Sequence, residues 1–236
     1  YLLGSSAGLV LHDASGVVKN HATADGGGIY ADLGAYVTLQ NGNTEVLSNT
    51  CGANGGGLYL TGEGGGISTR LNMIYNGGRI EGNHAAGSVS QGGGGVYVTQ
   101  GAAVYAEDST FAGNTTGVYG GAIHVAQDGV LTPTDVILNG GNVVTRNQAL
   151  LGGGLYIKDD GSHVVISDSR IEENHASSTG GGIRLFGDAE MDLIGGSTLM
   201  GNTAASDGGG LAMYTGTVTL DDVTVHENEA IGGDGG

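Results

Sequence analysis

Residues 171–186 read Ile-Glu-Glu-Asn-His-Ala-Ser-Ser-Thr-Gly-Gly-Gly-Ile-Arg-Leu-Phe, and this stretch contains both landmarks from which the fold can be predicted. The first landmark is an apolar residue, Ile171, three places before Asn174, with the small residue Ala176 two places after it. The second landmark is a run of three glycines that leads into Ile183, nine places after the asparagine. Short apolar runs that are bounded by such turn residues are typical of β-strands.

Both landmarks recur along the whole chain. The asparagine returns at steps of 26 to 34 residues, which defines an imperfect repeat of about 29 residues. These asparagines are Asn20, Asn49, Asn83, Asn114, Asn147, Asn174, Asn202 and Asn228. The aliphatic residues after the glycine corner are Ile29, Leu58, Val96, Ile123, Leu155, Ile183 and Leu211. Repeats of this length indicate a solenoid, in which each repeat packs on the next.

Each repeat contains three short runs in which apolar residues alternate with period two, such as 155–157, 164–166 and 223–225. Because the same corner returns at the same phase, the simplest geometry is one coil per repeat, with the coils stacked at about 4.8 Å. We therefore predict an all-β fold, a right-handed parallel β-helix of about eight coils with three short strands per coil. Residues 1–236 are expected to form a single β-solenoid domain or a segment of a longer solenoid.

The repeated asparagine and a repeated tyrosine are the candidate site residues. An asparagine in a buried turn can bond backbone groups of its own coil and the amide of the next coil, so we expect the eight asparagines to form a structural ladder. The tyrosines stand between two inward-facing aliphatic residues and should face outward; His124 takes their place in the fourth coil. Such a stripe either binds sugar rings or a partner protein, or is an internal stack that stiffens the rod. Its members are Tyr30, Tyr59, Tyr97 and Tyr156.

Composition narrows the classes of partner. The chain has 51 glycines, and 24 acidic against 7 basic residues give it a net charge of −17. Repulsion by this charge argues against binding to nucleic acid or to anionic membranes. No apolar run of 18 residues exists, so we expect no direct insertion of this segment into a membrane. With one cysteine, Cys51, the chain has no internal disulfide.

The sequence Phe111-Ala112-Gly113-Asn114, followed by Gly-Gly-Ala-Ile at 120–123, resembles the paired motifs of the chlamydial polymorphic outer-membrane proteins. It is equally similar to the wider class of bacterial outer-membrane repeat proteins with pectin-lyase-like β-helices. The likeness covers nearly the whole chain, although most of the other glycine corners read Gly-Gly-Gly. The resemblance implies a secreted passenger that is displayed at the bacterial cell surface and is often adhesive.

Catalytic and metal sites have weaker support in the sequence. Acidic residues are adjacent at 107–108, 159–160, 172–173 and 221–222, but neighbours on a strand point to opposite faces and the pairs stand at different repeat phases. The histidines that follow the ladder asparagine, His21, His84 and His175, belong to coils that are not adjacent. We predict no metal site and no cofactor. Incidental Ca²⁺ binding stays open, because acidic or amide residues precede the glycine corner at Asp25, Asn54, Asp207 and Asp234.

The two termini of the sequence are in phase with each other. Residues 232–236 match the glycine corner, and Tyr1-Leu2-Leu3 matches the strand that follows such a corner. We expect either a window of a longer solenoid or subunits that stack head to tail into a filament. The leading hypothesis is a non-catalytic extracellular structural or adhesive solenoid, and hence not an enzyme, whose partner is itself or a host or cell-surface protein or glycan. The alternative is a polysaccharide lyase or glycosidase on the same scaffold.

Overall fold

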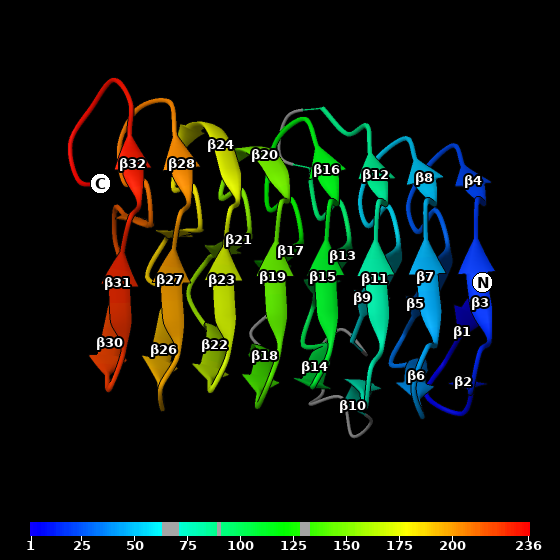
Figure 1. Ribbon diagram of the computed structural model, residues 1–236. Coiled ribbons are helices and arrows are strands. Elements are labelled where there is room, and N and C mark those ends of the chain that lie inside the picture. The colour runs from blue at the N-terminus through cyan, green and yellow to red at the C-terminus, as the bar shows by residue number, and fades with distance from the viewer. Residues whose placement is uncertain (63–70, 89–90, 128–132) are drawn as a thin grey trace.

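The computed structural model describes residues 1–62, 71–88, 91–127 and 133–236, which form eight stacked coils (Figure 1). Each strand pairs in parallel with the equivalent strand of the adjacent coils, on one side only in the first and last coils, and the two termini lie at opposite ends of the stack. The regular elements in this part of the chain are all strands. It accordingly contains no helix that is long and apolar enough to cross a membrane.

The strands form four parallel sheets, which we name A to D in the order in which the chain visits them. Sheet A consists of β1 (Leu2–Leu3), β5 (Ile29–Asp32), β9 (Leu58–Thr61), β13 (Val96–Thr99), β17 (Ile123–Ala126), β21 (Leu155–Lys158), β25 (Ile183–Phe186) and β29 (Leu211–Met213). Sheet B consists of β2 (Gly8–His12), β6 (Tyr36–Gln40), β10 (Leu71–Tyr75), β14 (Ala103–Glu107), β18 (Thr134–Asn139), β22 (Ser162–Ser167), β26 (Glu190–Ile194) and β30 (Thr217–Asp221).

Sheets C and D complete each coil. Sheet C consists of β3 (Gly16–Val18), β7 (Glu45–Leu47), β11 (Arg79–Glu81), β15 (Thr110–Ala112), β19 (Val143–Thr145), β23 (Arg170–Glu172), β27 (Thr198–Met200) and β31 (Thr224–His226). Sheet D consists of β4 (His21–Ala22), β8 (Thr50–Cys51), β12 (His84–Ala85), β16 (Thr115–Thr116), β20 (Gln148–Leu151), β24 (His175–Thr179), β28 (Thr203–Ala204) and β32 (Glu229–Ala230).

The prediction of three strands per coil was wrong, because each described coil has four. The missed strand lies in sheet D, directly after the ladder asparagine, and in most coils it has only two residues, such as His84–Ala85. Two residues are too few to show an alternation of period two, which is the pattern that identifies a strand in a sequence. The other three sheets coincide with the three predicted runs, and the eight coils were predicted correctly.

The core consists of rows of similar side chains stacked on each other along the axis. In sheet C, Phe111 stands in register between Ile80 and Val144, and all three are completely buried. Alternate residues of sheets A and B, such as Val98 and Leu138, complete the same core. Burial of one such side chain stabilises the fold by about 1.5–3 kcal/mol. The core therefore needs only that each coil places an apolar residue at the same phase.

The glycine corner brings the chain from sheet D to sheet A with its backbone pressed against the next coil. Gly180 has a positive φ of 71°, a conformation that favours glycine. A β-carbon on Gly181 would lie 2.3 Å from the carbonyl oxygen of Gly209 in the next coil, which is closer than any real contact. The repeated glycines are therefore required by backbone packing between coils.

Candidate functional site

The ladder asparagines are held between coils, as Asn114 illustrates. Its Oδ1 accepts hydrogen bonds from the backbone N and the Nδ2 of Asn83, both at 3.0 Å. Its own Nδ2 donates to the carbonyl oxygen of Ile80 at 2.8 Å and to Oδ1 of Asn147 at 3.1 Å. The same bonds link the series from Asn20 to Asn228. The structure thus brings all eight predicted residues into one line, where their polar atoms serve the neighbouring coils.

The residue before each ladder asparagine adopts the left-handed conformation, with φ between 54° and 60°. This residue turns the chain from sheet C to sheet D. Three of these positions hold glycine, but the other five hold residues with a side chain, which costs about 1–2 kcal/mol in this conformation. The positions are Lys19, Ser48, Gly82, Gly113, Arg146, Glu173, Gly201 and Glu227. The turn is therefore maintained by the asparagine bonds beside it and not by the local residue type.

The predicted tyrosines lie in one aromatic row on the outer face of sheet A. Tyr1, Tyr30, Tyr59 and Tyr97 stack face to face, with ring centroids 4.7 to 5.3 Å apart. His124 follows Tyr97 edge-on at 4.8 Å, and Tyr156 follows His124 at 5.2 Å. Counted along sheet A, the row therefore passes through every coil from the first to the sixth, with a histidine in the fifth.

Tyr97 and Tyr156 lie on the outer side of sheet A, as predicted, but they are each only 3% exposed, so they offer no open binding surface. Successive coils lie so close together that each ring of the row covers the next one. Tyr119, from the turn before β17, also stacks on Tyr156, with ring centroids 4.4 Å apart. Burial raises the pKa of Tyr156 to about 12. Tyr30 and Tyr59 remain half-buried. Most of the row is thus an internal stack, and only its N-terminal part presents ring surface to solvent.

His124 occupies an enclosure made by three tyrosines. Its ring meets those of Tyr97, Tyr119 and Tyr156 edge-on, at angles of 71° to 81° between the ring planes. Its side chain is 1% exposed, and neither ring nitrogen has a hydrogen-bond partner among the described residues. Burial, assisted by the positive charge of Lys158, lowers the pKa of His124 to about 3. The imidazole is therefore neutral at neutral pH and acts as a small aromatic member of the row.

Arg184 continues the row in the seventh coil by a cation–π contact. Its guanidinium carbon lies 6.0 Å from the ring centroid of Tyr156 and 4.5 Å from that of Tyr214. The guanidinium also donates from Nη1 to the hydroxyl of Thr179. A planar cation thus substitutes for a ring at this position.

The other candidate ligands of metals do not converge. His21, His84 and His175 each bond through Nδ1 to a threonine hydroxyl of the next coil, at 2.8 to 2.9 Å. Asp25 accepts from the backbone N and Nδ2 of Asn54, both at 2.9 Å, so this pair bridges two coils. Over the ranges that the structure describes, no group of three or more His, Cys, Asp or Glu is arranged to hold a metal ion.

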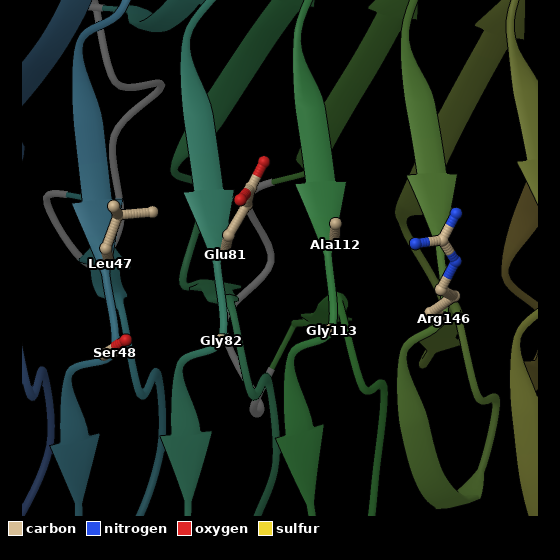
Figure 2. Close-up of a pocket in the computed structure, with 7 residues that line it drawn as sticks. All are labelled: Leu47, Ser48, Glu81, Gly82, Ala112, Gly113 and Arg146. Atoms are coloured by element: carbon tan, nitrogen blue, oxygen red, sulfur yellow. The ribbon is translucent and has the colours of Figure 1, made fainter.

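A shallow hollow of about 350 Å³ crosses the corner between sheets C and D over four successive coils (Figure 2). Gly82, Ala112 and Gly113 form its floor, because they lack the longer side chains found at these positions in other coils. Its rim carries Glu81, which binds Arg79 at 2.6 Å, and Arg146, which binds Glu173 at 2.9 Å. Each of these two charged groups is thus paired with a neighbour of opposite charge, and the described lining of the hollow offers no chemistry beyond its shape.

A second hollow of about 350 Å³ lies beside the outer face of sheet B and is acidic. We name it the acidic recess. Asp135, His163 and Glu190 stand in register on β18, β22 and β26, and Asp160 and Asp188 come from the turns before β22 and β26. The adjacent acidic pairs in the sequence did not identify this site. The signal is instead that Asp135, His163 and Glu190, like Asp160 and Asp188, stand one repeat apart.

We predict that His124 makes the fold sensitive to acid. Its pKa is about 3 in the folded state against about 6.5 when unfolded, so the unfolded state binds an extra proton between these values. Stability is therefore complete above pH 6.5 and is lost as the pH falls towards 3, by about 1.4 kcal/mol per pH unit from this group. Denaturant unfolding across this range should show that His124→Phe removes this part of the slope.

The exposed residue His84 provides the matched control, and His84→Phe should leave the slope unchanged. Identical pH dependence of the wild-type chain and the His124→Phe variant would mean that the imidazole is not buried as a neutral ring.

Comparison with known proteins agrees with this geometry. The family model described as a right-handed β-helix region matches residues 7–232, which is nearly the whole chain. No curated protein and no solved structure gives a significant match. The predicted right-handed coil is thus confirmed, and the chain belongs to the right-handed β-helix family.

Proposed function

We propose that the chain is a non-catalytic structural and adhesive β-solenoid of the cell surface. The observation that carries this proposal is that its recurring side chains bind neighbouring coils. The asparagine ladder runs from Asn20 to Asn228, and the aromatic row occupies the outer face of sheet A. Side chains that bond to neighbouring coils stiffen a rod. They are then not free to bind or convert a substrate.

The charge and the sequence motifs support an extracellular location. A net charge of −17 keeps such a rod soluble and repels nucleic acid. The resemblance of Phe111-Ala112-Gly113-Asn114 to the motifs of chlamydial outer-membrane proteins extends the proposal to a passenger displayed on a bacterial outer membrane. Its partners would be a host or cell-surface protein or glycan, or further copies of itself.

Stacking beyond these eight coils also forms part of the proposal. Within the ladder, each asparagine offers its Oδ1 to the coil before it, and its backbone N and Nδ2 to the coil after it. The coil edges at Asn20 and at Asn228 are therefore complementary. A further coil, from the same chain or from a second copy, would continue both the ladder and the four sheets, and repetition between copies would build a filament.

Electron microscopy of the purified chain tests stacking between copies. We expect filaments one solenoid wide, which shorten in the Asn228→Leu variant because the Nδ2 donor to the next coil is lost. The same substitution at the exposed turn residue Asn41 is the control and should leave filament length unchanged. Short, uniform particles of the wild-type chain at high concentration would contradict stacking between copies.

The second candidate function is cleavage of a polysaccharide, and the acidic recess is the observation in its favour. Glycosidases and lyases need carboxylates that converge on one face, either for acid–base chemistry or with a bound cation. Asp135 and Glu190 lie in the recess two coils apart, with His163 between them. We place this function second, because His163 is the one basic group among the described residues of the recess that could stabilise negative charge developing on a sugar acid.

Incubation of the purified chain with acidic and neutral polysaccharides, followed by measurement of new reducing ends and unsaturated products, distinguishes the two functions. A structural rod should release neither product. Turnover that disappears in Asp135→Asn and Glu190→Gln, but persists in the exposed control Glu229→Gln, would overturn the non-catalytic assignment.

A further inference from the structure

The outer face of sheet B carries an apolar track along the axis of the rod. Met73, Tyr105, Ile137 and Val165 project outward at equivalent positions of β10, β14, β18 and β22, which lie side by side in Figure 1. Each of these side chains is half-buried and keeps part of its surface open to solvent. The inner faces of the same strands supply the core, so this apolar row is additional to what the fold requires.

Hydrogen bonds along one border hold the apolar track in a fixed shape. The hydroxyl of Tyr105 donates to Glu107 at 3.3 Å and accepts from Nδ2 of Asn139 at 3.2 Å. The side-chain oxygen of Asn139 in turn accepts from the hydroxyl of Ser167 at 2.7 Å. A rigid surface loses little conformational entropy when a partner binds, which favours association.

The acidic recess forms the opposite border of the apolar track. Asp135 and His163 flank Ile137 and Val165 on their own strands, and Glu190 and Asp188 follow in the next coil. Asp192 takes the next position of the track after Val165, and its carboxylate lies 3.4 Å from Nε2 of His163. The described residues that line the recess include four carboxylates and no lysine or arginine, so their charge complements that of a cationic group.

We propose that the apolar track and the acidic recess together bind an extended segment of a partner protein in which apolar residues are followed by basic ones. Four coils span three steps of about 4.8 Å, a length that about four extended residues cover. Lysine or arginine side chains of the segment enter the recess, and its aliphatic residues lie on Met73, Ile137 and Val165. Aliphatic side chains suit these partners better than sugar rings do, since only Tyr105 offers a flat aromatic face.

The proposal rests on the adhesive part of the proposed function and supplies its docking surface. The two remain separable, because a structural rod needs no peptide ligand. Failure of the chain to bind the peptide would remove the docking surface and leave the non-catalytic rod in place. Polysaccharide turnover would overturn the non-catalytic rod and leave the docking surface in place.

Fluorescence anisotropy with a labelled synthetic peptide in which leucines are followed by lysines tests the proposal on the full chain. The triple variant Asp135→Asn, Asp188→Asn, Glu190→Gln should weaken binding about tenfold or more, because several charge pairs are lost at one place. The matched control removes three exposed carboxylates elsewhere, as Asp13→Asn, Glu227→Gln and Glu229→Gln, and should change affinity less than about twofold.

The apolar contribution is measured separately. Ile137→Thr with Val165→Thr keeps β-branched residues in the strands and should weaken binding of the lysine–leucine peptide, but not of a lysine–serine peptide. The exposed residue Val18 on sheet C is the control, and Val18→Thr should have no effect on either peptide.

Three results would overturn the proposal. Equal weakening by the two charge variants would show attraction by net charge alone. Tighter binding of a glucosamine oligomer than of the peptide, lost in the same triple variant, would assign the surface to a cationic glycan. Absence of binding by either probe at low salt would show that the surface is not a docking site for basic ligands.

Discussion

The stack of coils depends on the hydrogen bonds that each ladder asparagine accepts from the coil before it. At the corner between sheets C and D the chain leaves one sheet and enters the next, and a buried backbone N–H without a partner costs about 1–3 kcal/mol. The Oδ1 of Asn147 meets this need for Asn114, as does the Oδ1 of Asn83 for Asn49. The linked residues are 26 to 34 positions apart, so the ladder restores the register after each coil whatever the length of its turns.

The features that could be predicted from the sequence are those in which geometry demands one residue type. Only asparagine offers an acceptor and a donor of the right reach at the corner, and only glycine fits where Gly181 meets Gly209, so both landmarks survive in every coil. A second row of buried polar residues lies at the corner between sheets B and C. This row was not predicted from the sequence, because the residue type there varies from coil to coil. In this row the amide oxygen of Asn142 accepts a hydrogen bond from the backbone N of Ser109. The hydroxyl of Ser197 accepts one from the backbone N of Ser169.

The burial of the aromatic row could not be inferred from alternation alone. Alternation places Tyr97 and Tyr156 on the outer side of sheet A, and this is correct. Their exposure depends on neighbours from other parts of the chain, since Tyr119 reaches Tyr156 from a turn. The acidic recess escaped prediction for a similar reason, because Asp160 and Asp188 belong to turns whereas Asp135 and Glu190 belong to strands.

The four faces of the rod thus differ in what remains available to a partner. The outer face of sheet A is largely occupied by its own aromatic row, and at the corner between sheets C and D the ladder is buried beneath a shallow hollow whose rim charges are paired. Sheet B combines an apolar track with a group of carboxylates such as those of Asp135 and Glu190. The coils repeat strictly, but the side chains on the outer face of sheet B differ from coil to coil. This face is therefore where a specific partner of the β-helix should be sought.

Hydrogen exchange of the side-chain amides, followed by NMR on uniformly ¹⁵N-labelled protein, tests the ladder most directly. Both Nδ2 protons of Asn83, Asn114 and Asn147 are bonded, one to a carbonyl and one to the next asparagine. We expect them to exchange as slowly as the backbone amides of the core, while those of the exposed turn residues Asn41 and Asn43 exchange at the rate of free amides. Fast exchange at Asn114 in the folded protein would show that the ladder does not hold the coils together.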